Sequence, residues 1–118
     1  MGYTLDGLIK RRKELEELIN SLKEERDKIR EKLIKIKSKE DELYKKLTRT
    51  RDPIEASKIE ILIQRVSELR KKVESKLEEI ERKLRGAERE LNEVSRRIRI
   101  LKPRAVKWVV EYERREEK

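Results

Sequence analysis

The sequence predicts an all-α fold in which a long antiparallel two-helix coiled-coil hairpin is followed by a short C-terminal helix. Charged residues make up 52% of the 118 positions and apolar residues only 34%, a balance typical of long coiled-coil helices. Apolar residues recur every seven positions over most of the chain. Only two prolines, Pro53 and Pro103, interrupt this pattern. The hairpin and the last helix are expected to form a single domain, residues 1–118.

The first helix is predicted over about residues 5–47. One heptad series in it is apolar throughout, and a companion series alternates apolar and charged residues. The apolar series is Leu8, Leu15, Leu22, Ile29, Ile36 and Leu43, and the companion series is Leu5, Arg12, Ile19, Arg26, Leu33, Glu40 and Leu47. We interpret the charged members as residues that set the register of the packed helices.

A turn is predicted over about residues 48–52. Asp52 is a good helix N-cap, Pro53 suits the first helical position, and Glu55 completes a pattern similar to a capping box. A turn this short makes the two helices antiparallel. The expected register places Glu40 near Ile63, with no ion pair across the seam, and lets the helices approach closely at residues 86–87.

The second helix is predicted over about residues 53–101, and a short helix over about 104–116 follows Pro103. Two heptad series run through this half of the chain, and fifteen of their sixteen members are apolar or aromatic. They are Ile59, Val66, Val73, Ile80, Ala87, Val94, Leu101 and Trp108, and Ile63, Arg70, Leu77, Leu84, Leu91, Ile98, Ala105 and Tyr112.

The second half carries more apolar surface than the first helix can cover, so a protein interface is expected there. The candidate interface residues are Leu62, Leu69, Leu101, Ala105, Trp108, Val109 and Tyr112. The sequence is compatible with three occupants: a second copy of the chain in a homodimer, another protein, or the chain's own first residues when the C-terminal segment folds back.

Basic residues gather in clusters, and the net charge is +9. The candidates for binding a polyanion are Lys10, Arg11, Arg12, Lys13, Lys45, Lys46, Arg49, Arg51, Arg96, Arg97, Arg99, Lys102 and Arg104. A further basic stripe runs over residues 28–39. Such clusters suit sequence-independent binding of RNA or DNA. They equally suit a solvated coiled-coil surface whose charges pair along each helix.

Several functions are disfavoured by the composition. The chain has no Cys and no His, which excludes thiolate and imidazole metal ligands and the catalysis that depends on them. No phosphate-binding loop or catalytic motif is present, so we expect no enzyme activity, cofactor, metal or small-molecule substrate. The absence of a signal segment or a membrane span predicts a cytoplasmic protein. The scarcity of Asn and Gln resembles the usage of thermophile proteins, although an engineered helical protein could share it.

Part of the chain resembles the hairpin core of archaeal ESCRT-type membrane-remodelling proteins. The resemblance covers residues 40–46, Asp52, residues 56–58 and residues 68–71, and the rest of the chain does not follow that pattern. The resemblance implies a filament or membrane-surface subunit. The residue patterns themselves favour a structural or adaptor coiled coil that presents a protein-binding surface and self-associates. A basic hairpin that binds RNA or DNA is the alternative.

Overall fold

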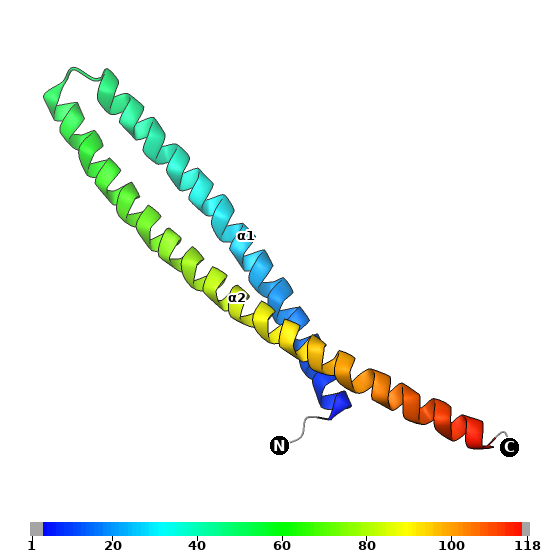
Figure 1. Cartoon of the computed structure of the whole chain (residues 1–118). Helices are drawn as coiled ribbons and strands as arrows, with labels where there is room; N and C mark the ends of the chain where they lie inside the picture. Colours follow the sequence, from blue (N-terminus) through cyan, green and yellow to red (C-terminus); the bar gives the residue numbers. More distant parts are fainter. Residues whose placement is uncertain (1–3, 117–118) are drawn as a thin grey trace. The chain divides into compact units, whose positions relative to one another are not determined.

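Two long α-helices make up nearly all of the protein. The structure is a computed structural model that describes residues 4–116, with side chains described for residues 4–102. Helix α1 spans Leu5–Arg49 and helix α2 spans Pro53–Glu116 (Figure 1). No strand occurs among residues 4–116. The predicted all-α class, with two long helices separated near Asp52, is confirmed.

The end of the second helix differs from the prediction. Pro103 was expected to separate it from a short helix over 104–116, but α2 continues through Pro103 to Glu116. A proline inside a helix removes one backbone hydrogen bond and costs about 3 kcal/mol. The heptad series in the sequence keeps its phase across Pro103, so a helix that continues also continues the apolar stripe.

The chain divides into two units, each of which contains part of both helices. The terminal unit comprises Met1–Ser21 and Leu84–Lys118, and the turn unit comprises Leu22–Lys83. In the terminal unit, α1 and α2 are joined by an ion pair between Arg11 and Glu90, with an N···O distance of 2.8 Å.

In the turn unit the helices are antiparallel. Arg30 of α1 pairs with Glu81 of α2, and ten residues further along α1 Glu40 pairs with Arg70, which is earlier in α2. The connection between the helices is limited to residues 50–52 (Figure 1). A reversal of direction at this point is what the short linker predicts.

The heptad pattern accounts for the whole core among the described side chains. All sixteen buried residues belong to the four predicted series, and every other described member of those series is at least partly buried. In the terminal unit Leu8, Leu15, Val94 and Ile98 form one cluster, against which Leu5 and Leu101 also pack. The buried residues of the turn unit are Leu22, Ile29, Leu33, Ile36, Glu40, Ile59, Ile63, Val73 and Ile80.

Side-chain caps begin both helices. The Asp52 carboxylate accepts a hydrogen bond from the backbone N–H of Ile54 at 3.0 Å, which confirms its role as N-cap of α2. Glu55 accepts a hydrogen bond from the Thr50 hydroxyl at 3.1 Å and therefore does not complete a standard capping box. At the other helix, the Thr4 hydroxyl accepts from the backbone N–H of Gly7 at 3.0 Å.

The close approach expected at residues 86–87 is only half present. Ala87 is buried, as its heptad position requires. Gly86 is exposed, and a Cβ atom built on it would meet nothing within 4 Å. The small size of Ala87, rather than the absence of a side chain at Gly86, is therefore what the packing uses.

Candidate interaction surfaces

The apolar flank of α2 remains exposed in the structure. Leu62 and Leu69 each expose 45% of their surface, and they lie one heptad apart beside the seam of the turn unit. Leu101 differs from them because it packs against the core cluster of the terminal unit. The other residues predicted for the interface lie outside the described side chains, namely Ala105, Trp108, Val109 and Tyr112.

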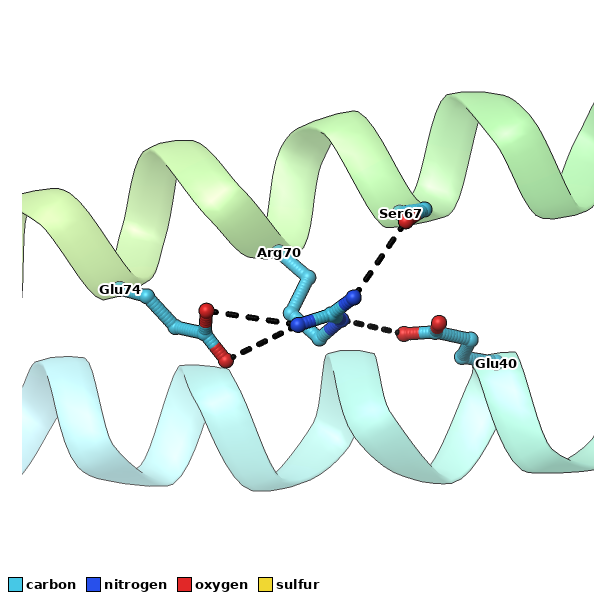
Figure 2. A network of polar contacts seen from close by, with 4 residues as sticks. All are labelled: Glu40, Ser67, Arg70 and Glu74. Atoms are coloured by element: carbon cyan, nitrogen blue, oxygen red, sulfur yellow. Dashed lines mark hydrogen bonds and ion pairs between the residues drawn. The ribbon is translucent and has the colours of Figure 1, made fainter.

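A charged network crosses the seam of the turn unit (Figure 2). Arg70 extends from α2 toward α1, and its Nε donates to a Glu40 oxygen at 2.7 Å. Its two other nitrogens donate to Glu74, at 3.2 and 3.3 Å, and to the Ser67 hydroxyl, at 3.4 Å. The side chains of Glu40 and Arg70 are only 12% and 25% exposed. The guanidinium thus has a partner on every nitrogen.

This network corrects the predicted register. Glu40 was expected near Ile63 without an ion pair across the seam, but it pairs with Arg70, seven residues further along α2. The hydrogen bonds to Glu74, and then to Glu40, raise the pKa of Arg70 above its ordinary value. The pair can form only where these two positions lie in adjacent layers.

The other charged seam residues make no such cross-seam pair among the described residues. Arg26 contacts its neighbour Asp27 at 3.3 Å, on the same helix. Arg12 is partly buried, and no carboxylate lies within 4.0 Å of its guanidinium in the described structure. Of the four charged residues at seam positions, only Glu40 and Arg70 join the two helices.

The predicted basic clusters at residues 10–13 and 96–104 both fall in the terminal unit. Arg11 and Arg97 line one surface hollow of about 530 Å³, so the structure brings these two members together. Both are already paired with acids: Arg11 with Glu90 and Arg97 with Glu93, the latter at 3.1 Å. The hydrogen bond to Glu90 raises the pKa of Arg11. The remaining candidates there are Lys10, Lys13, Arg96, Arg99 and Lys102, all exposed, and Arg12, partly buried, while Arg104 lies outside the described side chains.

The basic cluster at the turn is different. Lys45, Lys46, Arg49 and Arg51 are all exposed. In the described part of the chain, none of the four has a carboxylate oxygen within 4.0 Å. Their charges are therefore solvated rather than neutralised within the protein.

Heptad position reveals a larger basic surface that the clusters in the sequence did not. When the seam series containing Ile36 and Ile59 is lettered d, and that containing Glu40 and Ile63 is lettered a, positions c and g lie on one side of the seam and b and e on the other. Arg30 and Glu81, both at e, pair across the helices and confirm that like letters share a side. The c and g residues of the turn unit define what we call the basic face.

The basic face contains far more cations than acids. It has eleven cations and four acids, which give a net charge of +7, and it also contains Leu62 and Leu69. Its cations are Lys28, Lys32, Lys35, Lys39, Lys46, Arg49, Lys58, Arg65, Lys72, Lys76 and Lys83, and its acids are Glu25, Glu42, Glu55 and Glu79. The basic stripe seen in the sequence is split by the fold, since Arg30 and Lys37 lie on the other side. Assigning each charged residue to its heptad position would have identified the basic face from the sequence.

No metal site or membrane-crossing segment occurs in the described part of the chain. No group of three or more acidic side chains is arranged to hold a metal ion there. None of the described helical segments combines the length and apolar character that crossing a membrane requires.

No known protein family, curated protein or solved structure matches this chain.

Proposed function

We propose that this protein is a non-enzymatic coiled-coil adaptor that binds another protein through the side of its turn unit. The observation that carries the proposal is the exposure of Leu62 and Leu69 at heptad spacing beside a packed seam. Burial of apolar surface is the main favourable contribution to most protein association. Leucines that flank a two-helix seam are the contacts through which a further helix packs.

Self-association belongs, in this proposal, to a second surface in the C-terminal part of α2. Its sequence carries Ala105, Trp108, Val109 and Tyr112. Trp and Tyr are enriched among the residues that dominate interface energetics. A homodimer joined through this segment leaves Leu62 and Leu69 available to a different protein, which is what an adaptor requires.

Protein binding is preferred to nucleic-acid binding for two reasons. Arg11 and Arg97, which lie where the two terminal basic clusters meet, are bound to Glu90 and Glu93, and a phosphate would have to displace these partners. A duplex bound through its phosphates would also leave exposed leucines in water.

The test of the proposal combines affinity capture with sedimentation. The full chain should retain a protein from a nuclease-treated lysate of its source, and Leu62→Ser with Leu69→Ser should abolish that retention. In sedimentation velocity the wild type should dissociate from dimer to monomer on dilution, while Trp108→Ala should be monomeric at all concentrations. A chain that is always monomeric and retains only nucleic acid contradicts the proposal.

A further inference from the structure

The two sides of the turn unit carry opposite charge balances. The basic face has a net charge of +7, whereas the opposite side, formed by the b and e positions, has four cations and six acids. Those cations are Lys23, Arg30, Lys37 and Lys71, and those acids are Asp27, Asp41, Glu60, Glu74, Glu78 and Glu81. The basic character of the turn unit is thus concentrated on one of its sides.

The charges of the basic face are not compensated within the protein. Among the described residues only Lys83 of its eleven cations has a carboxylate within 4.0 Å, Glu79 at 3.6 Å. Cations three or four residues apart on a helix repel one another. The repulsion persists in the isolated protein and is relieved by an anionic partner, which is therefore favoured on this side.

The two exposed leucines indicate what kind of anionic partner fits. Leu62 and Leu69 occupy g positions within the basic face and are spaced by one heptad. A helix that carries apolar residues at the same spacing can bury both of them, and acidic residues beside those positions can meet the surrounding lysines. A second copy of this face cannot bind here in the same way, because it would bring eleven further cations against the first eleven.

The basic face is long enough to accommodate a docked helix of several turns. Its cations on α1 run from Lys28 to Arg49, which is about 32 Å of helix or about three heptads. Ile54 and Ile61, at f positions of the same helix, are also exposed. The cations Lys58 and Arg65, at c positions, separate them from Leu62 and Leu69, so these residues do not form the continuous apolar helix face that insertion into a lipid surface requires.

We propose that the basic face of the turn unit is the docking site for an acidic amphipathic helix of a partner protein, with its apolar residues at heptad spacing. The proposal rests on the adaptor function above and names the chemistry of the partner. The helix lies along the seam, its apolar residues cover Leu62 and Leu69, and its Asp and Glu side chains pair with lysines of α1 and α2.

A labelled synthetic peptide tests the proposal directly. The probe is a helix of about three heptads, with Leu at the seam positions and Glu at the flanking ones. Its controls are a scrambled peptide of the same composition, a short duplex DNA and vesicles containing phosphatidylserine. Binding to the full-length chain is followed by fluorescence anisotropy and, for the vesicles, by co-sedimentation.

Two variants and one matched control separate charge from apolar contact. Lys39→Glu, Arg65→Glu and Lys72→Glu together reverse three charges on the basic face. Lys23→Glu, Lys37→Glu and Lys71→Glu make the same change in net charge on the opposite side, also at exposed positions. Leu62→Ser with Leu69→Ser removes the apolar contacts. Circular dichroism confirms that each variant remains helical.

The patterned peptide is expected to bind more tightly than the scrambled peptide, the duplex or the vesicles. Reversal on the basic face should weaken its binding about tenfold or more, and the control reversal by less than about threefold. The leucine variant should weaken peptide binding about tenfold and leave binding of the duplex unchanged. Raising the salt concentration should weaken the wild-type complex more than it weakens the complex of the charge-reversed variant.

Other results would overturn the proposal. Equal binding of patterned and scrambled peptides, or equal effects of the two charge reversals, shows that only net charge matters. Tighter binding of the duplex or of the vesicles, unaffected by the leucine variant, assigns the face to nucleic acid or to lipid. Failure to bind the peptide, with lysate capture still dependent on Leu62 and Leu69, removes the acidic helix but leaves the adaptor function standing. Loss of both removes the adaptor function as well.

Discussion

The terminal unit and the turn unit are built on the same heptad pattern, yet they distribute charge in opposite ways. At the described c and g positions of the terminal unit there are two cations, Arg11 and Arg97, and both are paired with acids. At the equivalent positions of the turn unit there are eleven cations, ten of which have no carboxylate within 4.0 Å among the described residues. The same packing pattern therefore supports two different surfaces, and it is the surface charge that distinguishes the two units.

The seams of the two units differ as well. The seam of the terminal unit centres on an apolar cluster of Leu8, Leu15, Val94 and Ile98. In the turn unit two adjacent layers instead contain the pair of Glu40, which is buried, and Arg70, which is partly buried. Apolar layers are similar to one another and tolerate a shift of one heptad, whereas an ion pair is satisfied in one register only. We infer that the apolar seam supplies stability and the charged pair supplies the alignment of the helices.

The largest effect is expected from the apolar seam. Leu15 is fully buried in the terminal unit, so Leu15→Ala should lower the free energy of unfolding by about 2–5 kcal/mol, because it removes buried methyl groups and leaves a cavity. Leu18 lies three residues away on the same helix and is 47% exposed. Leu18→Ala should therefore change the free energy by no more than about 0.5 kcal/mol. Urea denaturation followed by circular dichroism measures both, and equal losses would contradict the assignment of the seam.

The next largest effect is expected from the ion pair of Glu40 and Arg70 in the turn unit. Glu40→Ala leaves a partly buried guanidinium with one partner fewer and should lower the free energy of unfolding by about 2 kcal/mol. The matched control is Glu90→Ala in the terminal unit. Glu90 is 47% exposed, and its loss should cost no more than about 1 kcal/mol.

A double substitution of the same ion pair separates stability from alignment. Glu40→Leu with Arg70→Leu should restore the midpoint of urea denaturation to at least the wild-type value, because well-packed apolar residues replace a buried pair without loss. The distance between spin labels at exposed positions on α1 and α2 of the turn unit should then broaden into more than one population. A single sharp distance in the double variant would show that the pair does not set the register.

Most of the packing was predictable from the sequence, and the charged details were not. Seven-residue periodicity identified every buried side chain in the described structure, because two helices can bury only the stripe that faces the partner. The predicted register was wrong, because a repeating apolar stripe specifies which face of each helix is buried but not which layer of one helix packs against which layer of the other. The partner of Glu40 could be found only with both helices in place. The Thr4 cap was missed because a single Thr followed by Leu5 and Asp6 is a weak signal for a cap.

The basic face shows the same limit for function. Six of its eleven cations were visible in the sequence, in the stripe over 28–39 and in the cluster at the turn. Proximity along the chain grouped Lys28 and Lys39 with Arg30 and Lys37, which the fold places on the other side. Cations separated by thirty or more residues, such as Lys35 and Lys72, share a face only after the chain reverses.

A smaller effect is expected at the turn. The Asp52 carboxylate satisfies the backbone N–H of Ile54 at the start of α2, and Asp52→Ala should lower the free energy of unfolding by about 1 kcal/mol. Asp52→Asn keeps the capping oxygen and should retain most of the stability. Thermal unfolding of the two variants tests this, and equal losses would indicate that the negative charge, not the hydrogen bond, is what matters.

The smallest effect, with the opposite sign, is expected from the two glycines in the terminal unit. Gly86 is helical, exposed and has no neighbour within 4 Å of a Cβ position, so Gly86→Ala should raise the free energy of unfolding by about 0.5–1 kcal/mol through the lower backbone entropy of alanine in the unfolded chain. At Gly7 the added Cβ would lie 3.0 Å from the Thr4 hydroxyl that caps α1. Gly7→Ala should therefore stabilise the protein less than Gly86→Ala does. Chemical denaturation of the two variants compares them, and a loss of stability in Gly86→Ala would show that the helices do approach at that position.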